Sequence, residues 1–270
     1  MLSSQSKTKT KGYLVVASTK YRFYSFAINL LESIKDYNPD ANVCLVTEER
    51  FLDSRADIAD HVILCDDSQR AKLWGMANSP YDLTFYIDAD CEVLHEDISK
   101  IWDELGDNDM MFTGLPKDRW YVFKDTKVNG GEDMQYCGAV CLYDSSNPII
   151  KEFMMDWYDQ WTKQQDTTWW PLNEHGQHDY DKFPESLRPW DQFSLWWLTN
   201  RVEKYSHLKV GIFENDLKWN YWAILDRNKQ PMPEDTVIFH LSCQANKFDD
   251  GKDDSLKPEW RKRSKKEPNG

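Results

Sequence analysis

The sequence is short of positive charge and lacks long apolar runs. Its 46 acidic residues exceed its 33 lysines and arginines, giving a formal net charge of -13 at pH 7. This balance argues against nucleic acid or an anionic membrane as the main partner, because both bind basic surfaces. No apolar run approaches the ~20 residues that span a bilayer, and residues 1–11 are polar and basic, unlike a signal peptide. We therefore expect a cytoplasmic protein, in the host cytoplasm if it is viral.

The sequence also lacks any Cys-x-x-Cys pair, although it contains six cysteines. They are Cys44, Cys65, Cys91, Cys137, Cys141 and Cys243. These spacings argue against a zinc site. They are typical of buried free thiols in a reducing compartment.

What the sequence does contain is enough apolar surface for one substantial core. It has 270 residues, of which 40% are hydrophobic, and no repeat or linker divides it. We predict one domain over residues 12–250, with flexible tails over 1–11 and 251–270. The basic residues near the C-terminus indicate either a solvated end or a segment that docks on an acidic surface.

The first half of this domain alternates apolar runs with segments of helical spacing. The expected strands are 12–18, 42–47, 61–65 and 83–87, and the expected helices are 22–36 and 68–77. This alternation predicts an α/β fold with a Rossmann-like, mostly parallel sheet flanked by helices. Residues 12–105 are therefore the expected nucleotide-binding half, with ligands beyond the carboxyl ends of the strands.

The second half, residues 106–250, is less regular. We expect strands over 109–115, 135–143, 209–213 and 236–241, and helices over 147–164 and 190–202. Residues 166–190 have no period and are rich in Trp, Pro, His and Asp, which predicts a long loop or a lid.

The stretch LTFYIDADCEVLHEDI, residues 83–98, ends a buried strand on two carboxylates, Asp88 and Asp90. Two carboxylates this close repel each other and raise each other's pKa unless a cation lies between them. Mg²⁺ and Mn²⁺ take oxygen ligands, and Mg²⁺ typically combines one or two carboxylates with substrate phosphates. The stretch therefore predicts a divalent cation that holds a diphosphate, and the cation also lets an acidic protein bind an anionic nucleotide.

In this context, residues 70–105 resemble the core of the glycogenin-like, family 8-type nucleotide-sugar glycosyltransferases with the GT-A fold and an Asp-x-Asp motif. Those enzymes carry a basic residue on the helix before the Asp-x-Asp strand, which corresponds to Arg70 or Lys72. A Val or Leu and a short helix follow the motif, as Val93 and residues 97–105 do here.

Other short segments match the same family in the same order over residues 12–248. The resemblance places Thr19 and Tyr21 beside the base and ribose, Gly138 in the sugar-pocket turn, and Asp191 and Gln192, as the candidate catalytic residues, at the Asp-Gln helix start. It assigns the sugar and the acceptor to residues 106–250. It makes His240 a metal ligand and Lys247 a diphosphate contact. Two features depart from the family: LSCQAN follows His240 without a glycine, and Cys137 replaces the usual Asn or Asp.

The resemblance thus implies a metal site of Asp88, Asp90 and His240, and Mn²⁺ is the favoured ion over Mg²⁺ because imidazole suits it better. Alternatives remain for individual residues. Arg70 and Lys72 could be a solvated helix face, Asp191 could be a carboxylate favoured by a helix dipole, and a lone histidine after a strand is usually a core residue.

Thirteen tryptophans give the chain a surplus of sugar-stacking groups. Trp169, Trp170 and Trp190 flank the irregular segment and are candidates for an acceptor platform. Those within expected helices, Trp157, Trp161, Trp196 and Trp197, are more typical of a core.

The sequence therefore predicts a metal-dependent glycosyltransferase of the hexosyltransferase type. It would move a sugar from a nucleoside diphosphate donor, a UDP-sugar, to a glycan or other hydroxyl acceptor, with retention implied by the resemblance. Two alternatives remain open. One is a haloacid dehalogenase-type phosphatase, which also uses a strand ending in Asp-x-Asp, and the other is a non-catalytic carbohydrate-binding protein.

Overall fold

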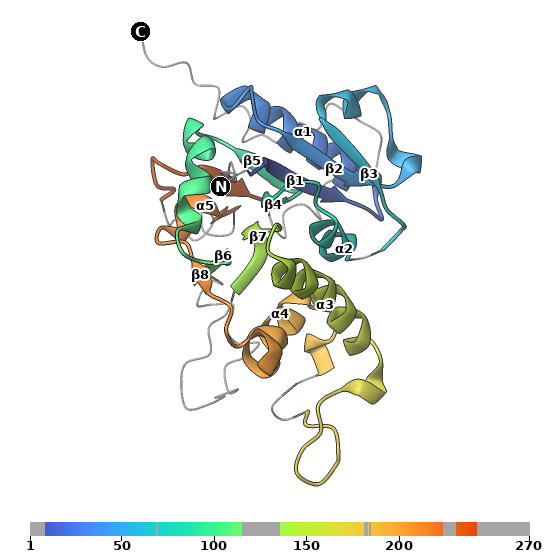
Figure 1. The fold of residues 1–270 in the computed structure, drawn as a ribbon. Coiled ribbons are helices and arrows are strands. Elements are labelled where there is room, and N and C mark those ends of the chain that lie inside the picture. Colours follow the sequence, from blue (N-terminus) through green and yellow to red (C-terminus); the bar gives the residue numbers. More distant parts are fainter. Residues whose placement is uncertain are drawn as a thin grey trace, which may run out of the picture.

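The computed structural model describes residues 9–68, 70–114, 136–180, 183, 185–223 and 231–241. The chain forms a mixed α/β structure with a central seven-stranded sheet in the order β3-β2-β1-β4-β7-β6-β8 (Figure 1). A second, three-stranded sheet has the order β5-β10-β9. Among the described residues, no helix has both the length and the apolar character needed to cross a membrane.

The first half of the chain supplies the parallel part of the large sheet. Its strands are β1 (Lys11–Ala17), β2 (Val43–Thr47), β3 (His61–Leu64) and β4 (Leu83–Asp88). All three neighbouring pairs among them run parallel. Helix α1 (Tyr21–Tyr37) connects β1 to β2, and α2 (Ala71–Ala77) connects β3 to β4. This is the predicted alternation of strand and helix.

The second half completes the sheet with mixed polarity. Strand β7 (Tyr136–Asp144) runs antiparallel to β4, β6 (Met110–Gly114) runs antiparallel to β7, and β8 (Val210–Ile212) runs parallel to β6. The β6–β7 register shifts, because Phe112 pairs with Cys141 while Thr113 pairs with Cys137. Strand β7 therefore leaves the ladder around Gly138, next to the carboxyl end of β4.

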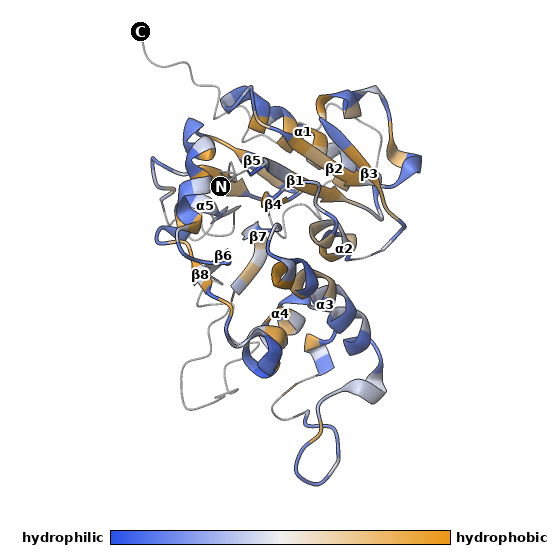
Figure 2. Ribbon diagram, viewed as in Figure 1, coloured by the Kyte–Doolittle hydropathy of each residue, from blue (hydrophilic) through white to orange (hydrophobic). Residues whose placement is uncertain are grey.

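Helices cover both faces of the large sheet. Alternate residues of β1 divide between the two sides: Tyr13 and Val15 pack with α1, while Leu14 and Val16 pack with α2 and α3 (Pro148–Gln164). In Figure 2 the strands are largely hydrophobic, whereas the outer turns of α3 are hydrophilic. At Gly75 of α2 an added Cβ would lie 2.7 Å from Val16 Cγ2, so glycine permits the close approach of α2 to β1.

The small sheet is built from distant parts of the chain. Strand β5 (Cys91–Val93) follows the Asp-x-Asp motif and pairs antiparallel with β10 (Ile238–His240), which pairs parallel with β9 (Tyr221–Trp222). Short helices surround it: η3 (Glu96–Leu105) and α5 (Asp216–Trp219). The segment predicted as a helix over 97–105 is therefore a run of 3-10 turns.

A further region surrounds α4 (Asp191–Arg201). The 3-10 helices η5 (Thr167–Trp169), η6 (Glu185–Leu187) and η7 (Glu203–Tyr205) belong to it, and η5 and η6 lie in the predicted irregular segment. Two further 3-10 helices, η1 (Glu49–Phe51) and η2 (Ser54–Ile58), lie elsewhere, between β2 and β3 on the side of α1. The five described cysteines are free, as expected, and four of them are buried. The predicted fold class is confirmed, while the domain limits at 12 and 250 stay a prediction.

Candidate active site

The carboxyl ends of β1, β2 and β4 meet at one edge of the large sheet because these strands run parallel. Asp88 is the last residue of β4, and Val16 of β1 is its register partner. Lys72, in the first turn of α2, reaches the same edge. This edge is where ligands bind in open α/β sheets.

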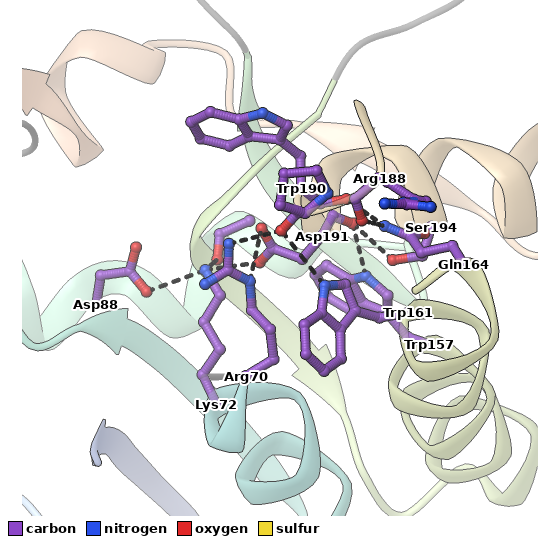
Figure 3. A network of polar contacts seen from close by, with 12 residues as sticks. Arg70, Lys72, Asp88, Trp157, Trp161, Gln164, Arg188, Trp190, Asp191 and Ser194 are labelled. Atoms are coloured by element: carbon purple, nitrogen blue, oxygen red, sulfur yellow. Dashed lines mark hydrogen bonds and ion pairs between the residues drawn. The ribbon is translucent and has the colours of Figure 1, made fainter. Parts of the chain in front are cut away.

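Lys72 is the centre of a charged cluster at this edge (Figure 3). Its Nζ lies 2.9 Å from Asp191 Oδ2 and 3.3 Å from Asp88 Oδ1, and it donates to the carbonyl oxygen of Gly138 at 3.4 Å. The Tyr86 hydroxyl donates a hydrogen bond to the same oxygen of Asp88. One ammonium group therefore joins residues from α4, β4 and β7.

The pKa values of this cluster reflect opposing effects of burial and charge. Burial favours the neutral form of Lys72, but the charges of Asp191 and Asp88 outweigh it and raise the pKa of the ammonium group. Burial also opposes ionisation of Asp191, yet Lys72 and Arg70 lower its pKa below 3.8. At Asp88 burial prevails over the attraction of Lys72, and the pKa is raised. Lys72 and Asp191 thus form a charged pair near neutral pH.

A set of side-chain donors fixes the backbone just before Asp191. Gln164 Nε2 donates to the carbonyl oxygens of Arg188 at 2.7 Å and Trp190 at 2.8 Å. Arg70 donates to the carbonyl oxygen of Pro189 at 3.0 Å, and its Nε lies 3.6 Å from Asp191 Oδ1. Figure 3 shows these contacts converging on the start of α4, from Gln164 of α3 and from Arg70. Arg70 is the residue before α2 and does not lie on that helix.

Gly138 and Gln192 adjoin Asp191, Gly138 through space and Gln192 as the next residue of α4. An added Cβ at Gly138 would lie 3.1 Å from the ring of Trp157 and 3.9 Å from Asp191 Oδ2. Within the described part of the chain, the buried side-chain oxygen of Gln192 accepts no hydrogen bond. An unsatisfied buried acceptor costs about 1–3 kcal/mol, so this oxygen is a candidate for contact with a ligand hydroxyl.

A second group of polar side chains lies where β4 passes into the small sheet. His240 Nε2 is 3.4 Å from Asp90 Oδ1, and Leu241 N donates to the Asp90 carbonyl oxygen at 2.9 Å. Among the described residues, Asp90, Cys91 and His240 form a group that could hold a metal ion, with donor atoms within 4.8 Å of one another. Cys91 and His240 are cross-strand partners in the β5–β10 pair, so their side chains lie on the same face.

The donor set of this group fits a divalent cation. His240 Nδ1 lies 3.0 Å from the side-chain oxygen of Asn220, which leaves Nε2 directed at Asp90. Burial lowers the pKa of His240, but the Asp90 carboxylate outweighs this and raises it. A positive charge is therefore favoured between the two side chains, whether a proton on Nε2 or a metal ion supplies it. Asp88, predicted as a third metal ligand, is not in this group and is held by Lys72.

The two residues predicted to contact the base and ribose of the nucleotide, Thr19 and Tyr21, follow the end of β1. Thr19 has a positive φ of 70°, which is uncommon for a β-branched residue and is a form of strain found at ligand sites. Its amide donates to Glu48 Oε1 at 2.5 Å, and Arg50 Nε lies 2.6 Å from the other oxygen of Glu48. The Tyr21 hydroxyl accepts from Arg55 at 2.5 Å. Both residues therefore stand at the edge where Asp88 ends β4.

The three candidate acceptor tryptophans differ in exposure. Trp190 is 48% exposed and lies next to Asp191, where Figure 3 shows its ring projecting away from α3 and α4. Trp170 is 1% exposed, and its indole N–H donates to the carbonyl oxygen of Phe183. The prediction that Trp170 stacks on the acceptor is therefore corrected: it belongs to a small aromatic core. Trp169 is partly buried against this core.

Lys247, the expected diphosphate contact, lies outside the described residues. Three residues that the sequence patterns did not mark contact predicted site residues in the structure, one beside Thr19 and two beside His240. They are Glu48, Asn220 and Cys91. Glu48 follows a buried strand and could have been found by that signal, whereas Asn220 lies twenty residues before His240 without any motif to mark it.

No protein-family model matches the sequence, and no curated protein matches it either. Solved structures do resemble the fold. The glycosyltransferase GlyE of Streptococcus pneumoniae TIGR4 superimposes with a TM-score of 0.56 at 13% identity, covering 95% of this chain. This chain spans about three fifths of GlyE, since the match covers 61% of that protein.

Two further structures match over nearly their whole length. The galactosyltransferase LgtC, solved with donor and acceptor sugar analogues, has a TM-score of 0.55 at 14% identity and covers 93% of this chain and 99% of its own. Mouse xyloside xylosyltransferase 1 has a TM-score of 0.53 at 11% identity, covering 87% and 99%. At these identities the likeness concerns the fold: the chain has the GT-A fold, which these glycosyltransferases share.

Proposed function

We propose that this protein is a metal-dependent glycosyltransferase. It transfers a sugar from a nucleoside diphosphate donor, a UDP-sugar, to a hydroxyl group of a glycan or similar acceptor, with retention of anomeric configuration. The observation that carries this proposal is the pair of Asp90 Oδ1 and His240 Nε2, 3.4 Å apart, directly after the strand that ends in Asp88. The GT-A fold supports it, because the solved neighbours are described as glycosyltransferases.

The donor nucleotide lies along the carboxyl edge of the large sheet in this proposal. Thr19 and Tyr21 border the base and ribose at the end of β1, and Asp88 contacts the ribose at the end of β4. Asp90 and His240 hold a divalent cation, Mn²⁺ in preference to Mg²⁺ because one ligand is imidazole. When bound, that cation stabilises negative charge on the departing diphosphate. Lys247 would add a positive charge at the same group.

The sugar occupies the pocket beside Lys72. Asp191 Oδ2, 2.9 Å from Lys72 Nζ, is fixed in place to accept a hydrogen bond from a sugar hydroxyl. The unsatisfied oxygen of Gln192 offers a second acceptor. A side chain at Gly138 would press on the ring of Trp157, so glycine permits β7 to pass this close to Trp157 and Asp191. Arg70 holds the backbone of this pocket through Pro189. These contacts orient the anomeric carbon and keep water from it.

The proposed transfer occurs on one face of the sugar. The anomeric C–O bond to the diphosphate breaks with its electron pair leaving on the phosphate oxygen, and the acceptor oxygen bonds to the same face. The acceptor proton passes to the departing phosphate. Asp191 does not act as a covalent nucleophile in this scheme, because Lys72 and Arg70 hold its carboxylate.

The acceptor approaches past Trp190. Gln164 Nε2 donates to the carbonyl oxygen of Trp190 at 2.8 Å, which fixes the backbone of Trp190, while this residue remains 48% exposed. The indole is therefore held at a defined place beside Asp191. An exposed indole offers a flat surface for the apolar C–H face of an acceptor sugar. This supports Trp190, among the three tryptophans first considered, as the acceptor platform.

Calorimetric titration tests the donor site directly. UDP and GDP are titrated into the wild type with and without Mn²⁺, and into Asp90→Asn. We expect UDP to bind with a Kd in the micromolar range, and we expect binding to weaken at least about tenfold when either Mn²⁺ or the Asp90 carboxylate is removed. Hydrolysis of a panel of UDP-hexoses then identifies the sugar.

Asp103→Asn is the matched control, because it removes the same charge from an exposed residue of η3. It should bind UDP and Mn²⁺ like the wild type. Failure of both nucleotides to bind under every metal condition would refute the transferase proposal. Hydrolysis of aryl phosphates with Mg²⁺ would then favour the phosphatase alternative, and binding of sugar alone would favour the carbohydrate-binding one.

A further inference from the structure

Asn220 is a buried polar residue that the predicted site does not include. It lies between α5 and β9 and is 1% exposed. The backbone N–H of Asn220 donates to the carbonyl oxygen of Asp216 at 2.9 Å, which fixes the backbone at this residue. Its side chain contacts Thr113 of β6, Cys137 of β7 and His240 of β10. Asn220 therefore connects the large sheet to the small one.

The contacts of the Asn220 carboxamide define its orientation. Its nitrogen donates to Thr113 Oγ1 at 3.0 Å and approaches Cys137 Sγ at 3.7 Å. Its oxygen consequently faces His240 Nδ1 at 3.0 Å. An amide oxygen only accepts hydrogen bonds, so Nδ1 must carry the proton. Cys137, which replaces the Asn or Asp of the resembled family, is therefore part of this cluster.

The other nitrogen of His240 is the one directed at Asp90, 3.4 Å from Oδ1. Both partners of the ring are acceptors, and a neutral imidazole has only one proton to donate. The Asn220 oxygen, 3.0 Å from Nδ1, is at ordinary hydrogen-bond length, whereas Asp90 Oδ1, 3.4 Å from Nε2, lies beyond it, so the proton of the neutral ring is placed on Nδ1. With Nδ1 protonated, Nε2 keeps its lone pair. The ring is also fixed from its side by Trp222, whose ring centroid lies 4.8 Å away.

From this geometry we infer that Asn220 is a positioning residue for cation binding: it holds neutral His240 in the Nδ1–H tautomer, so that Nε2 presents a lone pair beside Asp90. Histidine ligands of metals commonly donate their second N–H to a carbonyl or carboxylate, and loss of such a partner costs about 10–100-fold in metal affinity. The inference rests on the proposed function only for the identity of the cation as Mn²⁺. The tautomer itself is a property of the protein without metal.

The first test is nitrogen-15 NMR of the histidine side chains in the metal-free protein, at a pH where His240 is neutral, with His240→Asn used to assign its signals. We expect the wild type to show a protonated Nδ1 and an unprotonated Nε2. A wild-type spectrum with the proton on Nε2 would overturn the inference without the use of any Asn220 variant.

The second test compares Asn220→Leu with Asn220→Asp. Leucine has a similar size but no acceptor, so the proton should move to Nε2 and Mn²⁺ affinity, followed by the EPR signal of free Mn²⁺, should fall about 10–100-fold. Aspartate keeps an acceptor for Nδ1–H, so it should retain the wild-type tautomer and bind Mn²⁺ within a few-fold of the wild type.

The outcomes separate this inference from the proposed function. If folded Asn220→Leu keeps the Nδ1–H tautomer and binds Mn²⁺ like the wild type, Asn220 does not position His240 and the inference fails, while the metal site stands. If the wild type shows the expected tautomer but binds no Mn²⁺, the proposed metal dependence fails, while the assignment of the His240 tautomer to Asn220 stands.

Discussion

At the scale of single residues, Lys72 allows a buried carboxylate, Asp191, and a partly buried one, Asp88, to share one edge of the sheet. Asp88 and Asp191 come from different halves of the chain and both lie within 3.3 Å of Lys72 Nζ. Each carboxylate has little access to water, so its charge is tolerated only with a partner. Removing one member of a buried ion pair is therefore costly, because the other charge stays behind.

We predict that Lys72→Met destabilises the protein by about 3–5 kcal/mol at pH 7, because it leaves Asp191 buried without its closest cation. Urea unfolding followed by circular dichroism measures this free energy. The double variant Lys72→Met with Asp191→Asn should regain part of the loss, since the uncompensated charge is then absent.

Lys100→Met serves as the control, because Lys100 pairs with Asp97 on the surface and its side chain is 66% exposed. Its effect should be far smaller than that of Lys72→Met, because solvent screens an exposed ion pair. Equal destabilisation by the two single variants would contradict the ion-pair argument, as would a double variant less stable than Lys72→Met.

At the scale of elements, the irregular segment before α4 contains a small core of its own. Trp170, Phe183, Leu187, Phe193 and Trp196 pack together, apart from the two large clusters that sandwich the sheet. Trp170 stacks on Phe193 with ring centroids 4.8 Å apart. This packing attaches the segment to α4 and so places Trp190 beside Asp191.

We predict that two tryptophans of this segment differ in how much they contribute to stability. Trp170→Ala removes a buried ring and should destabilise by about 3–5 kcal/mol. Trp190→Ala removes an exposed ring and should change stability by no more than about 0.5 kcal/mol. If Trp190 carries the acceptor, its loss should raise the acceptor KM and leave the Kd for UDP unchanged.

Urea unfolding and initial-rate kinetics with varied acceptor concentration give both quantities. Trp190→Phe is a conservative companion that keeps an aromatic face and should restore much of the acceptor affinity. An unchanged acceptor KM in Trp190→Ala would exclude the platform, and a large stability loss there would indicate that the ring is structural instead.

At the scale of the whole molecule, an ion pair joins η3, in the first half of the chain, to α5, in the second half. Asp97 of η3 lies 2.7 Å from Lys218 of α5, across 121 residues of sequence, and 2.6 Å from Lys100. The hydrogen bond from Lys100 and then that from Lys218 lower the pKa of Asp97 from 3.8 to about 2. The ionised carboxylate therefore stabilises the folded chain.

The sign of this pH dependence follows from the depressed pKa. The contribution of Asp97 is fully present above the unfolded value of 3.8 and is lost as the pH falls towards 2. We predict that Asp97→Asn costs about 1 kcal/mol at pH 7, and that this difference from the wild type shrinks as the pH falls through that window. Urea unfolding at a series of pH values measures it.

Asp103→Asn is again the control, and it should follow the wild-type profile within about 0.5 kcal/mol at every pH. A difference between Asp97→Asn and the wild type that stays constant down to pH 2 would show that the lost contact is not an ionic one.

The sequence by itself determined the parallel half of the fold and the position of Asp88 and Asp90 at the end of one of its strands. Local patterns suffice there, because an apolar strand, a helical period and the Asp88–Asp90 pair are all properties of neighbouring residues. The family resemblance, and not any local pattern, indicated the GT-A fold and selected Lys72, Asp191 and His240, which the structure places in two clusters.

Only the tertiary structure decided which residues meet across long separations. It grouped Asp90 with Cys91 and His240, assigned Asp88 to Lys72, buried Trp170 and left Trp190 exposed. It also placed Asn220 against His240 at 3.0 Å. The physical reason is that side-chain contacts across the two sheets depend on register and packing, which no periodicity along the chain records.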